Sequence, residues 1–336
     1  QVARELASEQ GLPLVDFNGP MNKLASDFQK TNPKFTLIGN DRIHPGELGT
    51  TLMAYIFLQS QGVPGIVSET GIDAAAGKLV SARNGEVKEL IAKDGEISFI
   101  LLENALPIPF EGKSREALYL SPENELEKAE KTMKNPREGH VFPGWHSIPF
   151  QDNLNRQILL VSNLSEGRYE LLIDDLPVGC WNQDELAKGV NLAGVRATPQ
   201  YRQSLKVAQA HVKGHQQATG DPRAIAFTRL YTLAEAGVDI NDQTAVRAAI
   251  ERLINDPKAI DNPNLGSCGF AQTMAKKYFE NLGKEAETTA AIAAAADEVY
   301  KLNKPVAHRY LLRPLGHPLP VEQRQAVFAA RHNPEQ

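Results

Sequence analysis

The six residues from Asp41 to Gly46, Asp-Arg-Ile-His-Pro-Gly, have the clearest chemical potential in the chain. Two residues three apart across a tight turn can place a carboxylate against Nδ1 of an imidazole, which fixes the tautomer and leaves Nε2 free to accept a proton. Pro45 restricts His44 to extended backbone conformations. Asp41 and His44 are therefore the candidate orienting acid and general base of a hydrolase triad. A surface turn is the other interpretation of this spacing.

The residues around this motif predict the elements that would position it. Helical spacing of apolar residues over 2–10 ends at Gly11, and residues 12–17 read as a short buried strand. A helix is expected over 18–32, and a strongly apolar helix over 47–61 follows the motif. Alternating helix and strand is typical of α/β proteins with a parallel sheet. One buried strand needs neighbours, so the rest of its sheet must come from elsewhere.

The remainder of the chain changes character twice. From residue 66 to 181, short β-prone runs are separated by turn signals such as Asn84-Gly85 and Asp94-Gly95, which predicts antiparallel hairpins. Residues 158–181 in particular predict three antiparallel strands joined by tight turns. After Asn182 the pattern is almost entirely helical.

The Asp-x-x-His-Pro motif, followed by Gly49, Met53 and Ala54 in an apolar helix, resembles the closing block of the SGNH, or GDSL, hydrolase family. Further stretches resemble the long C-terminal extension of bacterial GDSL-type esterases and lipases, so the resemblance covers most of the chain. These stretches are residues 148–150, 155–157, 160–161, 167–171, 173–174, 179, 185–193 and 198–201.

The resemblance implies a flavodoxin-like α/β/α sandwich for the hydrolase domain. The predicted fold class is α/β: a partial flavodoxin-like SGNH unit at the N-terminus, then a small antiparallel β unit and a helical C-terminal region. The expected boundaries are 1–65 for the C-terminal part of the SGNH domain, 66–181 for the β-rich extension and 182–336 for the helical region. In the catalytic site, the resemblance implies Asp41 as the orienting acid and His44 as the base that activates a serine.

The nucleophile of such a site is missing from this sequence. Members of the family carry the serine in a Gly-Asp-Ser block, and the chain contains no Gly-Asp-Ser. Ser267 lies between predicted helices with no strand before it, so it is a poor substitute. We expect this chain to be the C-terminal part of a longer hydrolase whose N-terminal segment carries the serine. Alone, it should be inactive, because the serine and most oxyanion-hole donors would be absent.

Other candidate sites are weaker. His211 and His215 lie four apart on one predicted helical face and could share a metal, yet no third ligand is apparent, which favours a solvated or interhelical pair. Cys180 and Cys268 are two residues without the spacing of a zinc site. They are either buried free thiols or one long-range disulfide.

Composition excludes several classes of protein. The chain has 336 residues, of which 42% are hydrophobic, so a sizeable core is expected and a disordered or fibrous protein is excluded. With a formal net charge of -5, it offers no global positive field for nucleic acid. Its longest apolar runs are well short of the roughly 20 residues of a membrane-spanning helix.

The sequence therefore predicts a carboxylic ester hydrolase acting on small acyl esters, with acetylated carbohydrates among the candidate substrates. Neither a metal nor an organic cofactor is required, because the chemistry is proton transfer and oxyanion stabilisation. The family resemblance favours a periplasmic or secreted location. One alternative is a non-catalytic binding or scaffolding protein that retains the hydrolase's C-terminal architecture. Another is a metal-dependent hydrolase with Asp41 and His44 as ligands.

Overall fold

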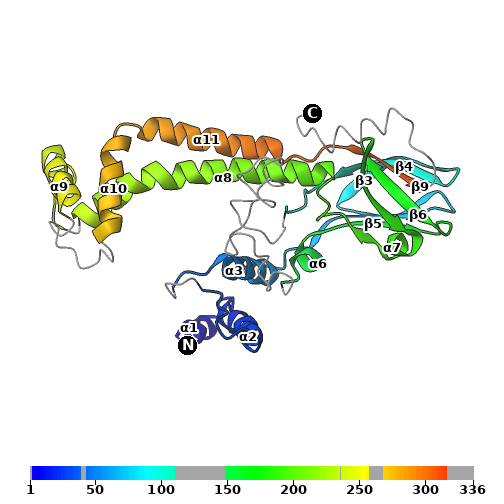
Figure 1. Cartoon of the computed structure of the whole chain (residues 1–336), viewed down its shortest axis with the longest axis horizontal. Helices are drawn as coiled ribbons and strands as arrows, with labels where there is room; N and C mark the ends of the chain where they lie inside the picture. The colour runs from blue at the N-terminus through cyan, green and yellow to red at the C-terminus, as the bar shows by residue number, and fades with distance from the viewer. Residues whose placement is uncertain (1, 39–42, 110–147, 235, 257–267, 316–336) are drawn as a thin grey trace. The chain divides into compact units, whose positions relative to one another are not determined.

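Two β-sheets and several helices make up the residues that the computed structural model describes, which are 2–38, 43–109, 148–234, 236–256 and 268–315. The chain divides into two compact units, one formed by residues 1–205 with 304–336 and the other by residues 206–303. Figure 1 shows the elements with their labels. The α/β class predicted from the sequence is confirmed, because helices and sheets are both present in the first unit.

The first unit contains a four-stranded sheet in the order β2-β1-β5-β8 and a five-stranded sheet in the order β3-β4-β9-β6-β7. All pairings are antiparallel except that of β1 with β5. The strands are β1 (Ile66–Asp73), β2 (Lys78–Arg83), β3 (Gly85–Lys93), β4 (Glu96–Glu103), β5 (Arg156–Ser162), β6 (Arg168–Ile173), β7 (Leu176–Asn182), β8 (Val190–Asn191) and β9 (His308–Pro314).

The two sheets share one hydrophobic core. Strands β4 and β5 bury every second residue, the period of a strand with one face turned inward. Phe99 of β4 stacks on Tyr310 of β9 with ring centroids 4.9 Å apart. Ile72 and Leu159 of the four-stranded sheet pack in the same cluster. Because both sheets contribute to one core, neither can bury its apolar face without the other.

Turn chemistry explains two hairpins and corrects two predictions. The β3–β4 hairpin turns at Asp94-Gly95, and the β6–β7 hairpin at Asp174-Asp175, with positive φ at all four residues.

At Asn84 the chain instead leaves one sheet for the other, so the hairpin expected at Asn84-Gly85 is wrong. The predicted three-stranded unit over 158–181 is also wrong, because β5 lies in a different sheet from β6 and β7. Local turn signals do not specify which sheet the next strand joins.

The N-terminal residues form helices and an unpaired extended stretch. The helices are α1 (Val2–Gln10), α2 (Asn18–Gln29) and α3 (Glu47–Ser60). The strand predicted over Leu12–Phe17 does not form, and Leu12 and Leu14 are 57% and 47% exposed. A strand requires a neighbour for its backbone hydrogen bonds, and the described residues around this stretch are helical.

The region expected to be helical, 182–336, is mainly helical in its described residues, with connecting loops, the short β8 and the strand β9. Its helices are α7 (Gln183–Lys188), α8 (Pro199–Ala226), the π-helix η2 (Phe227–Ala234), α9 (Gln243–Asn255), α10 (Cys268–Asn281) and α11 (Glu285–Leu302). The strand β9 runs between β4 and β6 and buries His308, Tyr310 and Leu312 on one face. The prolines of this tail are the reason why the alternation of buried and exposed residues in β9 was not predicted from the sequence.

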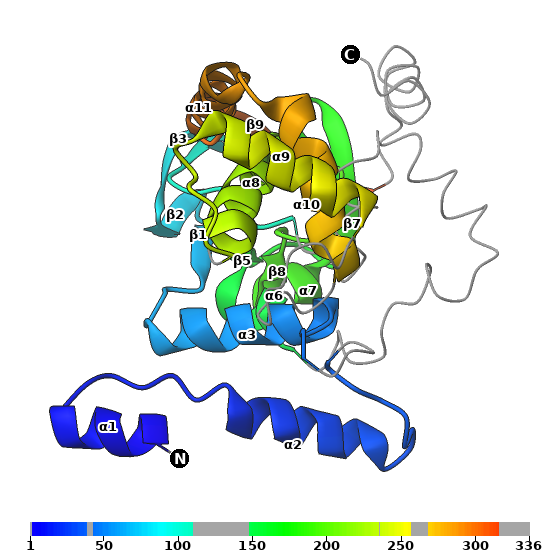
Figure 2. The same cartoon turned by 90° about the vertical axis from the view of Figure 1, so that its left-hand side faces the viewer.

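The second unit has its own hydrophobic core. Leu233, Ile250, Leu253 and Ala275 are fully buried where η2, α9 and α10 meet. In Figure 2, α9 lies across α10. α11 approaches α8 so closely that a Cβ added to Gly214 would lie 2.9 Å from Cβ of Ala295.

None of the helices in the described ranges combines the length and hydrophobicity needed to cross a membrane.

Leu171→Ala should lower the free energy of unfolding of the first unit by about 2–5 kcal/mol, because Leu171 is fully buried in β6 between β7 and β9. Urea unfolding followed by tryptophan fluorescence measures the change, since Trp181 packs against the core of this unit. Leu79→Ala is the matched control, because Leu79 is 41% exposed and should cost under about 1 kcal/mol. Equal costs for the two variants would contradict the assigned core.

Candidate active site

The segment that carries His44 is a loop closed at its base. An isolated antiparallel bridge joins Ile38 to Pro45, and the backbone N–H of Gly46 donates to the carbonyl of Leu37 at 2.9 Å. Thr36 Oγ reinforces the first arm, because it both accepts from the N–H of Ile38 and donates to its carbonyl, each at 3.0 Å. The two ends of the loop are therefore fixed to each other.

The start of α3 is pressed against this closure. A Cβ added to Gly49 would lie 2.4 Å from the carbonyl oxygen of Leu37, whereas one added to Gly46 would be 3.8 Å from it. Only glycine at position 49 allows the first turn of α3 to approach the loop so closely. Gly46 is the N-cap of the helix in an extended conformation, so His44 lies two residues before the helix cap.

Buried apolar residues hold the closed loop in place. Leu37 packs with Leu48 and Leu52 of α3 and with Phe150 of α6 (Phe150–Leu154) in a hydrophobic cluster. Asn153 of α6 also donates to the hydroxyl of Tyr55 on α3, at 2.6 Å. Both arms of the loop thus end in ordered structure.

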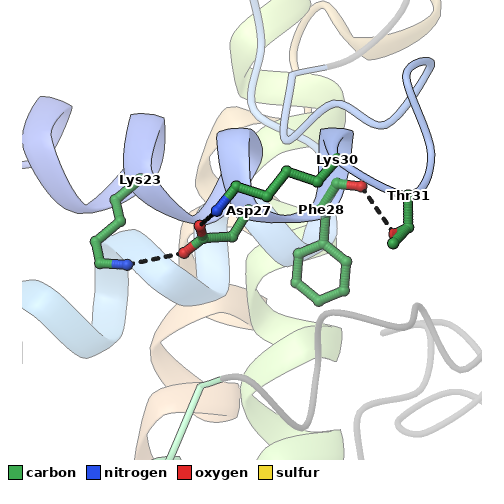
Figure 3. A network of polar contacts seen from close by, with 5 residues as sticks. All are labelled: Lys23, Asp27, Phe28, Lys30 and Thr31. Carbon is green, nitrogen blue, oxygen red and sulfur yellow. Dashed lines mark hydrogen bonds and ion pairs between the residues drawn. The ribbon is translucent and has the colours of Figure 1, made fainter.

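Helix α2 leads into the loop and ends in a polar network (Figure 3). Lys23 and Lys30 form ion pairs with opposite oxygens of Asp27, at 2.8 and 2.7 Å. Thr31 Oγ donates to the carbonyl of Phe28 at 3.2 Å, which satisfies an acceptor at the helix end. The hydrogen bonds from Lys23 and Lys30 lower the pKa of Asp27 from its ordinary value of 3.8 to about 2.

His44 is exposed at this loop, as a general base that meets substrate must be. Asp41 lies outside the described residues, so the contact between its carboxylate and the imidazole stays a prediction. Ser267 also lies outside them.

The candidate metal pair, His211 and His215, is exposed on α8. No group of three or more potential metal-ligating His, Cys, Asp or Glu side chains occurs in the described part of the chain.

Cys180 of β7 carries a free, half-buried thiol. Burial is the main cause that raises its pKa, and the charge of Glu170 adds to it. A raised pKa disfavours the nucleophilic thiolate. Cys180 is therefore a poor candidate for covalent catalysis.

Sequence reasoning missed a polar group buried between the two sheets around Glu103. Ile97, Phe99, Leu101 and Glu103 alternate along β4 and share its buried face. A carboxylate that continues an apolar alternation was the available signal, because a charged residue on the inward face of a strand needs an explanation.

Comparison with solved structures finds a similar chain described as BT4096, a gut microbial diltiazem-metabolizing enzyme. The neighbour is an enzyme. It is 28% identical in sequence with a TM-score of 0.74, and the match covers 94% of this chain. This chain spans 65% of the neighbour's length. No protein-family model matches the sequence, and no curated protein matches it. The comparisons thus establish a fold shared with an enzyme, while the SGNH family remains a proposal.

Gly49→Ala should displace the loop that carries His44 and destabilise the N-terminal part by about 1–3 kcal/mol, because the new methyl group meets a backbone oxygen. Thermal unfolding, with hydrogen exchange of peptides from α3, reports the change. Gly46→Ser is the control, since its Cβ fits and serine is a favourable N-cap. Equal protection of α3 in both variants would show that the close approach is not needed.

The Asp27 carboxyl should titrate near 2 in an NMR pH titration, and Lys23→Gln combined with Lys30→Gln should return its pKa toward 3.8. Because the folded pKa is depressed, the contribution to stability is present above the unfolded value and is lost as the pH falls from about 3.8 through about 2. Lys34→Gln is the control, as Lys34 is exposed and forms no ion pair with Asp27. An unchanged midpoint in the double variant would contradict the network.

Proposed function

We propose that this chain is the His- and Asp-bearing part of a serine ester hydrolase of the SGNH type, acting on small acyl esters. The observation that carries the proposal is His44, exposed on a loop whose two ends are clamped to each other and to a buried cluster. Such a position suits a base that must keep its orientation while it meets a substrate.

In this mechanism the carboxylate of Asp41 accepts from Nδ1–H of His44, and Nε2 takes the proton of the attacking serine hydroxyl. The serine oxygen adds to the ester carbonyl, and His44 returns the proton to the departing alcohol. Water then hydrolyses the acyl-serine with His44 again as the base. The proton of the serine leaves with the alcohol, and the acyl group leaves as the carboxylic acid when water hydrolyses the acyl-serine. No cofactor is needed.

The serine is proposed to come from a segment outside this sequence. Leu12 and Leu14 of the unpaired stretch, with Leu6 of α1, are about half exposed, and further strands would cover such side chains. The neighbouring enzyme's greater length is consistent with an additional segment. That segment would add the strands of a flavodoxin-like sheet to helices α1, α2 and α3.

The structural neighbour supports the choice of substrate class. The neighbour is described as a diltiazem-metabolizing enzyme. Diltiazem, as a compound, carries an acetate ester. An acetate ester is the bond that a His-activated serine cleaves. Aryl acetates and diltiazem are therefore the first substrates to test, followed by acetylated carbohydrates.

His44→Ala should reduce kcat/KM for an aryl acetate by roughly 10³-fold or more in the protein that includes the serine-bearing segment, because the base is lost. Asp41→Asn should cost less, since a misoriented imidazole is still a base. His211→Ala, which removes an exposed histidine of α8, should keep the wild-type rate.

A phosphonate probe for activated serines separates this function from a scaffolding role. The longer protein should be labelled and this chain alone should not. A wild-type rate for His44→Ala would refute the role of the imidazole. Absence of both labelling and turnover in the longer protein would favour the non-catalytic alternative.

A further inference from the structure

Glu103 at the end of β4 is a carboxyl group inside the sandwich, only 3% exposed. Three neutral side chains from three elements contact it. Ser68 of β1 forms a short hydrogen bond with Oε1, and Nε2 of Gln157 on β5 lies 2.9 and 3.1 Å from the two carboxyl oxygens. Gln200 of α8 is a further hydrogen-bonding neighbour. The carboxyl thus links both sheets to the start of α8.

Within the described residues, no lysine or arginine forms an ion pair with this group. An ionised carboxylate taken out of water without a paired cation is costly, and such a group is normally neutral. Burial is the main cause that raises the pKa of Glu103, while the hydrogen bonds from Ser68, Gln157 and Gln200 oppose the rise. Burial outweighs these hydrogen bonds, so the pKa of Glu103 lies above its ordinary value of 4.5.

The other titratable groups near Glu103 lie on or beside β9. His308 holds its Nδ1 2.6 Å from Asp174 Oδ2, while its Nε2 is buried without a hydrogen-bond partner. The hydroxyl of the buried Tyr310 accepts from Gln200 at 2.7 Å, and its pKa is raised well above the usual value by burial and by the charge of Glu103. A negative charge on Glu103 is therefore opposed by burial and only partly balanced by His308.

We propose that Glu103 holds a proton at neutral pH and that this proton locks the two sheets and β9 together, so that its loss loosens the sandwich. A neutral carboxyl can donate one hydrogen bond and accept others, which suits a site lined by a hydroxyl and two amides. An ionised carboxylate accepts only, and at a group this deeply buried it loses its hydration without a paired cation. The stability of the two-sheet region would thus depend on the protonation of Glu103, and this site is separate from the loop that carries His44.

The direction of the pH effect follows from the raised pKa. A group whose folded pKa lies above its unfolded value stabilises the fold fully below the unfolded value, here 4.5, and that contribution is lost as the pH rises through the folded pKa. Glu103 therefore makes the sandwich weaker toward alkaline pH. Asp27 and other carboxyls with depressed pKa act in the opposite sense, and only at acidic pH.

Infrared spectroscopy tests the proton directly. The wild-type protein in heavy water at pH 7 should show the carbonyl band of a protonated carboxyl group, and Glu103→Gln should lack it. Glu166→Gln, which changes an exposed glutamate before β6, should retain the band. A wild-type spectrum without the band at pH 7, or a band that survives in Glu103→Gln, would overturn the proposal.

Stability measurements test the lock. Glutamine mimics the protonated acid, so the ratio of unfolding constants, wild type over Glu103→Gln, should grow about tenfold per pH unit above 4.5 and level off above the folded pKa. After correction for the intrinsic rise of amide exchange with pH, the protection of amides in β4 and β9 should fall over the same range in the wild type only. A ratio independent of pH would contradict the lock.

Should Glu103→Gln fail to fold, Ser68→Ala provides a second test, because it removes one polar partner and leaves the carboxyl in place. The infrared band of this variant should persist and its titration should shift. An unaltered titration would show that the cluster does not control the proton.

Discussion

The five-stranded sheet depends on its central strand, β9, which is the last strand of the described sequence. β9 occupies the centre of the order β3-β4-β9-β6-β7, so it is the only link between the β3–β4 hairpin and the β6–β7 hairpin in that sheet. Its backbone pairs with β4 on one side and β6 on the other, and its buried face supplies Tyr310 and Leu312 to the shared core. Polar contacts also connect the start of β9 to the turn after β6. The carboxylate of Asp174 contacts the His308 ring and accepts from the backbone N–H of Arg309.

This dependence explains which parts of the fold the sequence could reveal. Hairpins with Asp-Gly or Asp-Asp turns and helices with clear caps are local features, and Asn182 indeed caps α7 with a reciprocal bond to Glu185. The position of β9 depends on partners more than 130 residues away, as the pairing of Leu171 with Leu312 shows. Likewise, Leu12–Phe17 has the composition of a strand but lacks a neighbour among the described residues. Non-local pairing, more than propensity, decided these cases.

The site shows the same limit. Spacing and family resemblance identified His44, and the structure adds the closure at Leu37 and Gly46 that holds its loop. Asp41 stays a prediction. The apolar alternation of β4 could have marked Glu103 as facing inward. Its partners could not be read from local sequence, because β1, β5 and α8 meet around it only in the folded chain. The proposed hydrolase chemistry and the buried proton therefore belong to different parts of the first unit, one exposed and one sealed from solvent.

The route of the chain between α8 and β9 has a consequence for the evolution of the protein. Gln203, near the start of α8, donates to the carbonyl of Lys304 at 2.7 Å, immediately before the chain re-enters the sheet. Departure and return of the whole second unit thus occur at neighbouring points, the arrangement that tolerates insertions of very different length. A longer, shorter or unrelated excursion would fit at this junction without altering the pairing of β9.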